Sequence, residues 1–260
     1  MVNSWTAKSI KIANAAGYLD SLLQVYSMDT NPPQPLAKGV IPILKEAYDK
    51  KETKKLIQLL LANSEVFPVK DSYVGFLKAK PTAIDENPKT MARIGQRLYD
   101  FGSFKDMLRE AERPIETNRQ MGNRFKAWLQ SLGYQPVNGA DMLVSKTGIK
   151  FLVGSDEALA TFANTHLGCH FEKGIDLVIK ANETYIVGEA KFLTTTGGEQ
   201  GGGFKDAFGI ASGTDGTPIR IAVIDGYVWL ATKKGVYPKI VGADRNIMSS
   251  LVLQEFLKSL

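Results

Sequence analysis

The sequence predicts an α/β fold, in which a mixed central sheet follows a helical N-terminal region. Before about residue 137, apolar residues recur at the spacing of amphipathic helices. After it, short runs rich in Ile, Val and Tyr alternate with glycine-containing turns, which is typical of strands. Hydrophobic residues make up 44% of the 260 residues, so the chain can bury a substantial core. We therefore expect two regions, residues 1–135 and 136–260.

The N-terminal region is expected to form successive helices. The first should end before the segment 31–35, because the prolines of that segment cannot continue a helix. Asn87 can cap a helix that starts at Pro88, and Gly133 would stop the last helix of the region. The expected helices cover residues 9–26, 37–49, 52–63, a segment from about 88, 103–111 and 118–132.

The second region is expected to alternate short strands with two helices. Ser155 can cap a helix that Gly168 ends, and a glycine-rich loop leads into a second helix over 200–210. Asp225-Gly226 is a strong signal for a two-residue hairpin. The expected strands cover 142–144, 150–153, 175–180, 184–193, 220–224 and 227–232, and the pair 175–180 and 184–193 should be antiparallel.

Three charged residues of that strand pair are expected to converge. Asp176 lies near the start of the first strand, whereas Glu189 and Lys191 lie two residues apart on the second and so point to one face. They could be ordinary solvated charges, but the apolar character of the strand makes unpaired charges costly there. Magnesium prefers oxygen ligands and is commonly held by one or two carboxylates with substrate phosphate. The pattern therefore indicates an Mg²⁺ site, with Lys191 placed to orient a water or stabilise developing negative charge.

Ile175-Asp176, twelve further residues and then Glu189-Ala190-Lys191 resemble the signature of the PD-(D/E)XK nuclease superfamily, with Ile175 in place of its proline. The resemblance implies a restriction-endonuclease-like αβββαβ core. It gives Asp176 and Glu189 the role of metal ligands, often joined by the main-chain carbonyl at the position of Ala190, and gives Lys191 the role of orienting the attacking water. The implied reaction is phosphodiester hydrolysis by Mg²⁺-activated water, which leaves 5′-phosphates.

Two further segments resemble type II restriction endonucleases. The segment 197–200 reads Gly-Gly-Glu-Gln, which is similar to the Gly-Gly-x-Gln loop that follows the motif in several of those enzymes, and the segment 118–129 also resembles them. The implied function is sequence-specific cleavage of double-stranded DNA. Palindromic cutting would imply a homodimer, because twofold DNA symmetry calls for twofold protein symmetry. Residues 1–135 become a candidate DNA-binding subdomain continuous with the nuclease core.

Other charged and polar residues are candidates for accessory and DNA-binding roles. An acid in the helix after Ser155 would suit an accessory metal-site role, although acids are also favoured there by the helix dipole. Basic residues near 119–126 could contact backbone phosphate or form a solvated face. The accessory candidates are Glu157, with Asp156 as its alternative, and Gln200, and the DNA-binding candidates are Arg119, Arg124, Lys126, Thr195 and Lys205. A zinc site at His166, Cys169 and His170 is disfavoured, because no fourth ligand is evident.

The remaining sequence features exclude several function classes. The net charge of +5 is compatible with a polyanion partner. The chain has a single cysteine and neither a signal-like segment nor an apolar run long enough to cross a bilayer, which predicts a cytoplasmic protein without membrane contact. The sequence has no P-loop motif, so we expect no nucleotide cofactor. Two rivals stay open: a DNA repair nuclease or Holliday-junction resolvase, and a non-catalytic DNA-binding protein on a nuclease fold. Digestion of plasmid DNA would distinguish them.

Overall fold

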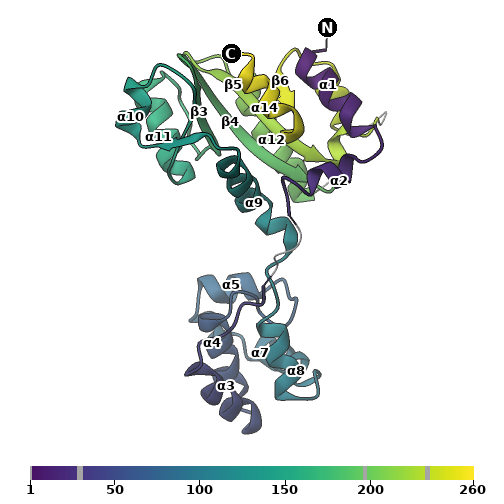
Figure 1. The fold of residues 1–260 in the computed structure, drawn as a ribbon. Helices are drawn as coiled ribbons and strands as arrows, with labels where there is room; N and C mark the ends of the chain where they lie inside the picture. Colours follow the sequence, from purple (N-terminus) through teal and green to yellow (C-terminus); the bar gives the residue numbers. More distant parts are fainter. Residues whose placement is uncertain (1, 28–31, 196–197, 232–234) are drawn as a thin grey trace. The chain divides into compact units, whose positions relative to one another are not determined.

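The computed structural model describes residues 2–27, 32–195, 198–231 and 235–260, with the backbone alone for 117–119 and 198–200. The chain divides into two compact units (Figure 1). The sheet unit comprises Met1–Met28 and Gln120–Leu260, and the helical unit, Asp29–Arg119, is inserted between these two segments. The chain thus crosses between units twice, near residues 28 and 119, rather than once near 135.

The helical unit confirms most of the helices expected within it. These are α3 (Val40–Asp49), α4 (Thr53–Asn63), α7 (Pro88–Tyr99) and α8 (Phe104–Ala111), to which the structure adds the short α5 (Val74–Ala79) and α6 (Ala83–Glu86). Ser103 caps α8 by accepting a hydrogen bond from the backbone N–H of Asp106. The apolar faces of α3, α4 and α7 bury Leu44, Leu56, Leu60, Ile94 and Leu98 completely. This unit therefore has a core of its own.

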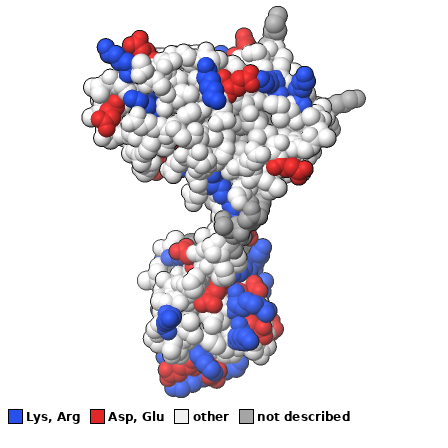
Figure 2. Space-filling view, viewed as in Figure 1, with Lys and Arg blue, Asp and Glu red and all other residues white. Residues whose placement is uncertain are grey.

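Charges on the helical unit are largely paired locally. On the face drawn in Figure 2, its Lys and Arg side chains lie beside Asp and Glu side chains. Along α3, Lys45 pairs with Asp49 at 2.6 Å and Lys50 with Glu46 at 2.6 Å. Exposed pairs of this kind contribute little to stability, but they neutralise much of the basic composition of the unit.

The sheet unit contains six strands in the order β1-β2-β3-β4-β5-β6. The pairs β2–β3 and β3–β4 are antiparallel and the others are parallel, so the predicted mixed sheet is confirmed. The strands are β1 (Gln135–Val137), β2 (Ile149–Leu152), β3 (Leu177–Ala181), β4 (Thr184–Leu193), β5 (Ile219–Gly226) and β6 (Asn246–Met248). The helices are α1 (Ser4–Ala13), α2 (Tyr18–Leu22), α9 (Thr117–Ser131), α10 (Gly139–Val144), α11 (Asp156–His166), α12 (Gly198–Ser212), α13 (Tyr237–Val241) and α14 (Ser250–Lys258).

Strands β4 and β5 are covered on both faces. Helix α12 contacts β4 and β5, and its Gly203 lies against Lys191 and Leu193 of β4. Because side chains alternate along a strand, Phe192 points to the opposite face, where its ring contacts Tyr26 at a centroid distance of 5.0 Å. Helix α11 contacts β3, and α14 contacts β5. The long strand β4 thus offers one face to α12 and the other to the N-terminal segment.

Two predicted elements of the sheet unit are wrong. Residues 142–144 are helical rather than extended, because Asn138 caps α10 by accepting a hydrogen bond from the N–H of Asp141. The helix expected over 9–26 is instead two helices, α1 and α2, with Gly17 between them at a left-handed φ of 80°. In both cases local backbone chemistry overrides the apolar pattern.

The hairpin predicted at Asp225-Gly226 is also wrong. Asp225 is completely buried, and the chain continues from β5 into a 3₁₀ helix, Tyr227–Trp229, instead of a strand over 227–232, of which residue 232 lies outside the described residues. Gly226 has a φ of 95°, and a Cβ there would come within 2.3 Å of the Leu193 carbonyl oxygen. The glycine is therefore needed because the backbone here passes very close to β4, and not because the chain makes a tight turn.

The structure adds elements that the sequence did not predict, namely β1, β6, α13 and α14. Helix α14 buries Val252, Leu253, Phe256 and Leu257 against the sheet unit's core. Among the described helices, none has both the length and the apolar character that crossing a membrane requires.

Candidate active site

The predicted Asp176, Glu189 and Lys191 converge at one point of the sheet unit. Asp176 directly precedes β3, and the antiparallel pairing of Leu177 with Gly188 brings it beside Glu189 of β4. The Lys191 Nζ lies 2.6 Å from Glu189 Oε1 and 3.5 Å from Asp176 Oδ2. The alternation of β4 turns Glu189 and Lys191 to the same face, as expected. The two acids and the amine therefore form one cluster.

The Asp176 carboxylate is fixed by the neighbouring strand. The backbone N–H of Ala190 donates a hydrogen bond of 3.0 Å to Asp176 Oδ2. The side chains of Asp176 and Glu189 are only 12% and 10% exposed. Two carboxylates are thus held together in a poorly hydrated place, where their mutual repulsion is weakly screened.

Burial and the neighbouring charges shift the pKa values of Glu189 and Lys191. Burial and the nearby Asp176 raise the pKa of Glu189 to about 7, and the pairing with Lys191 opposes this only in part. Burial disfavours the Lys191 ammonium, but the Asp176 and Glu189 carboxylates outweigh it and raise the pKa of Lys191 above its ordinary value. The amine is therefore protonated at neutral pH, and the acids compete for compensating positive charge.

The residues present fit a divalent cation. Glu189 Oε2 is buried and has no hydrogen-bond partner among the described residues, which is costly for a carboxylate unless something else binds it. The described residues contain no cluster of three or more His, Cys, Asp or Glu side chains that could hold a metal. An ion at this point would therefore have the two carboxylates of Asp176 and Glu189, a number that suits Mg²⁺ when water and phosphate complete its shell.

A second ammonium group reaches Asp176 from the other side. Lys126 of α9 forms an ion pair with Asp156, and its Nζ lies 3.8 Å from Asp176 Oδ1. The sequence placed Lys126 among the DNA-binding candidates and Asp156 as an alternative to Glu157, but nothing in it indicated that they meet. Lys126 and Asp176 are far apart in the chain, so only the packing of α9 beside β3 could reveal the contact.

Asp156 is brought to the cluster by a tight loop contact. It is the first residue of α11, which Ser155 caps by accepting a hydrogen bond from Ala158. The carbonyl of Asp156 accepts a hydrogen bond of 3.1 Å from Ile175, and a Cβ at Gly174 would lie 2.6 Å from the Cβ of Asp156. The α11 N-terminus and the segment before Asp176 are therefore pressed together.

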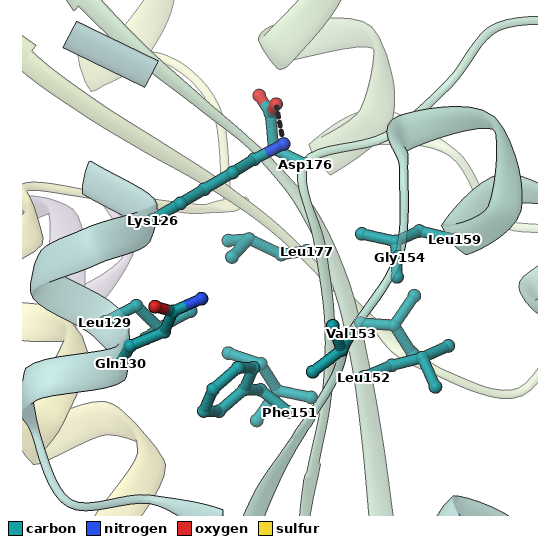
Figure 3. Close-up of a pocket in the computed structure, with 12 residues that line it drawn as sticks. Lys126, Leu129, Gln130, Phe151, Leu152, Val153, Gly154, Leu159, Asp176 and Leu177 are labelled. Carbon is teal, nitrogen blue, oxygen red and sulfur yellow. Dashed lines mark ion pairs between the residues drawn. The ribbon is translucent and has the colours of Figure 1, made fainter. Parts of the chain in front are cut away.

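A cavity of about 70 Å³ lies below the ion pair between Lys126 and Asp176 (Figure 3). Lys126 points from α9 across the top of it toward Asp176, and Gln130 of the same helix points into it. The rest of the lining is mainly apolar and comes from α9, β2, β3 and the start of α11. The Lys126 ammonium thus lies beside an apolar cavity, and its described ionic partners are the carboxylates of Asp156 and Asp176.

The remaining predicted site residues are dispersed. Lys205 and Glu189 line the same cavity of about 410 Å³ beside α12, and Thr195 is exposed after the end of β4. Arg124 donates to the Ser27 carbonyl and to Gln120. Glu157 is exposed, and no described contact joins it to Asp176. The side chains of Arg119 and Gln200 lie outside the described residues.

The three residues considered for zinc do not meet. His166 packs its ring against Phe162, with centroids 4.9 Å apart, and Cys169 is buried. His170 instead lies beside Asp215, with Nδ1 3.5 Å from its carboxylate. Within the described residues, these side chains serve packing and loop contacts.

Comparison with known proteins identifies a family. A family model described as Tsp45I type II restriction enzyme matches residues 3–260, nearly the whole chain. No curated protein and no solved structure matches.

Proposed function

The chain belongs to the Tsp45I type II restriction enzyme family and is therefore a sequence-specific endonuclease of double-stranded DNA, and we propose that Asp176, Glu189 and Lys191 carry its reaction. The observation that supports this assignment is the buried Glu189 Oε2, which has no hydrogen-bond partner among the described residues while it faces a second carboxylate. Most buried polar atoms in proteins have a hydrogen-bond partner, so an oxygen without one beside a second carboxylate supports a ligand site at this point.

In the proposed reaction, Asp176 and Glu189 would hold Mg²⁺, together with the main-chain carbonyl of Ala190. When bound, the ion would stabilise negative charge on the phosphodiester and lower the pKa of a bound water. Lys191 would hold the attacking water in line with the phosphorus and stabilise the charge that develops there. Its raised pKa supports this role, because a protonated ammonium donates hydrogen bonds without removing the proton from the water. Hydrolysis would leave 5′-phosphates.

The fold supports membership of the PD-(D/E)XK superfamily. The succession α9, β2, β3, β4, α12 and β5 has the order of an αβββαβ core, with β1, α10 and α11 as additions. In that assignment, the two acids and the lysine come from the second and third strands of the core, β3 and β4. We further propose a homodimer, because double-stranded cleavage at a symmetric site requires two such clusters.

Sequencing of digestion products tests the proposal. Purified protein is incubated with a long duplex DNA in Mg²⁺, and the ends are sequenced, with a chelator as the blank. Discrete fragments with one shared end sequence and 5′-phosphates are expected. Glu189→Ala should give no fragments, whereas Lys258→Met, an exposed change on α14, should cut like wild type. Fragments that persist in the chelator, or in Glu189→Ala, would refute the site.

A further inference from the structure

The Asp176 carboxylate lies between two ammonium groups, of which the proposed reaction uses only one. Lys191 approaches Oδ2 at 3.5 Å, and Lys126 approaches Oδ1 at 3.8 Å. Lys126 comes from α9, outside the strand pair that carries the other three residues. It is therefore an independent contribution of positive charge to the same point.

The position of Lys126 is well determined by its surroundings. On the same helix, Met121, Phe125 and Leu129 are buried in the core of the sheet unit, which fixes α9. The ion pair with Asp156 then directs the side chain toward Asp176, and Asp156 is itself held through Gly174 and Ile175. The ammonium is thus placed by packing and by a charged partner, rather than left free in solvent.

Stability alone explains this arrangement poorly. The side chains of Lys126 and Asp156 are 36% and 45% exposed, and ion pairs with such exposure contribute little to folding. That exposure leaves part of the Lys126 side chain accessible to a ligand. A cation that is held in place but still accessible, next to a proposed metal ligand, is suited to an anion.

With one Mg²⁺ bound, the summed charge of the cluster would equal and oppose that of one phosphodiester. Asp156, Asp176 and Glu189 carry three negative charges when ionised, and Lys126 and Lys191 carry two positive charges. The cluster alone is therefore negative by one, and with one Mg²⁺ it becomes positive by one. A single phosphodiester anion would neutralise that charge, whereas without Lys126 the metal-loaded cluster would already be neutral.

We propose that Lys126 is a further substrate-binding residue, whose ammonium, held by Asp156 beside Asp176, binds a backbone phosphate of the DNA at the cleavage position. The inference rests on the proposed function, because it takes that function's metal and substrate as given. Lys126 contacts phosphate rather than bases, so it contributes affinity and position without sequence preference.

The salt dependence of DNA binding tests the proposal. A short duplex that carries the cleavage site mapped with wild-type protein is titrated at several salt concentrations, with Ca²⁺ in place of Mg²⁺ and the DNA checked for integrity. Lys126→Met should reduce the slope of log K against log salt by about one, because one phosphate contact is lost. Its affinity should fall roughly threefold to tenfold near physiological salt, as one contact among several would.

Two matched variants and a melting-temperature measurement separate this effect from general charge or misfolding. Lys126→Arg keeps the positive charge and should restore the wild-type slope. Lys258→Met removes the same charge from an exposed position on α14 and should leave the slope unchanged. Lys126→Met should keep the wild-type melting temperature, because the ion pair is half exposed. If its melting temperature falls, Lys126→Gln is titrated in its place.

The outcomes distinguish this inference from the proposed function. If wild-type protein cuts DNA in Mg²⁺ but Lys126→Met has the wild-type slope, Lys126 does not bind phosphate and the inference fails alone. A loss of slope that Lys126→Arg does not restore also refutes it. If wild-type protein makes no metal-dependent cut, then the proposed function fails, and this inference fails with it.

Discussion

Asp225 and Glu189 are buried carboxylates on adjacent parallel strands, but they lie on opposite faces of the sheet. Asp225 of β5 pairs in register with Phe192 of β4, whose side chain points away from the face of Glu189 and Lys191. Asp225 accepts hydrogen bonds from the hydroxyls of Tyr26, at 2.8 Å, Ser249 and Tyr18, and from the backbone of Ser250. Both of its oxygens are therefore satisfied.

Glu189 is slightly less buried than Asp225, and its charge is much less well compensated. One of its oxygens pairs with Lys191, the other has no hydrogen-bond partner among the described residues, and a second carboxylate faces it. Burial raises the pKa of both acids, but only at Asp225 do donors surround the charge. The Asp225 carboxylate links α2, β5 and α14 through its hydrogen bonds. The Glu189 carboxylate, in contrast, has too few described donors and cations around it to compensate its charge. We interpret the first as structural and the second as functional.

The largest expected difference between the two sites is in catalysis. Glu189→Ala, Asp176→Ala and Lys191→Ala should each reduce the rate of cleavage about a thousandfold, which corresponds to about 4 kcal/mol of lost stabilisation of the transition state. The measurement is single-turnover cleavage of a mapped duplex at saturating protein. Equal rates for wild type and any of these variants would remove that residue from the site. Asp225→Ala, measured below its melting temperature, should keep a rate within a few-fold of wild type.

For stability we expect the opposite: the Asp225 variant should lose more free energy of unfolding than the Glu189 variant. Asp225→Ala leaves several buried donors without an acceptor, and we expect it to lower the free energy of unfolding by about 3 kcal/mol. Urea unfolding followed by tryptophan fluorescence measures this effect, because Trp5, Trp128 and Trp229 all belong to the sheet unit. Glu189→Ala should cost much less at pH 8. An Asp225→Ala protein as stable as wild type would end the structural interpretation.

The two sites should also differ in their response to pH. In the folded protein, burial and Asp176 raise the pKa of Glu189 to about 7 from its ordinary value of 4.5. Between these pH values the folded state binds more protons than the unfolded state, so the free energy of unfolding falls as pH rises through this window. In chelator, we expect wild type to lose about 2 kcal/mol relative to Glu189→Gln between pH 4.5 and 8, since relaxation around the charge reduces the full effect.

Addition of Mg²⁺ is the control for this effect of pH on stability. Mg²⁺ should restore the stability of wild type at pH 8, because an ion that binds the folded state stabilises it, and it should have less effect on Glu189→Gln. If the stability difference between the two proteins does not change with pH, then Glu189 ionises in the folded state as it does in the unfolded state. Its environment would then resemble that of a solvated acid.

The same contrast explains which parts of the molecule could be predicted from sequence. Glu189 and Lys191 lie on one strand, and Asp176 lies across a short turn from it, so local spacing was enough to predict that they converge. Asp225 was misread as part of a hairpin, because its donors come from Tyr26 and Ser249, at distant points of the chain. Lys126 reaches Asp176 only through the packing of α9. Periodicity and motif spacing carry no information about such long-range contacts.

Element boundaries follow the same rule. Helices with strong apolar periodicity and local caps, such as α8 after Ser103 and α11 after Ser155, were predicted closely. The mistaken strand at 142–144 is too short for periodicity to separate it from a capped helix. The insertion of the helical unit between α2 and α9 could not be predicted either, because whether two segments share a core depends on tertiary packing.

The smallest expected effect comes from a single donor to Asp225. Ser249 caps α14 by accepting a hydrogen bond from Leu251, and its hydroxyl also donates to Asp225. Ser155 caps α11 in the same unit in the same way but has no described contact with a carboxylate, so Ser155→Ala measures the value of a cap alone. Both variants should lose about 1 kcal/mol for the cap.

Ser249→Ala should lose about 1 kcal/mol more than Ser155→Ala, because it also removes a hydrogen bond to a buried charged group. The two free energies of unfolding are compared in the same urea titrations. In an Asp225→Ala background the extra loss should vanish, since the hydroxyl then has no carboxylate to bind. If it persisted there, the stability of this end of the sheet would depend on Ser249 packing rather than on saturation of the Asp225 charge, and the comparison with Glu189 would lose its basis.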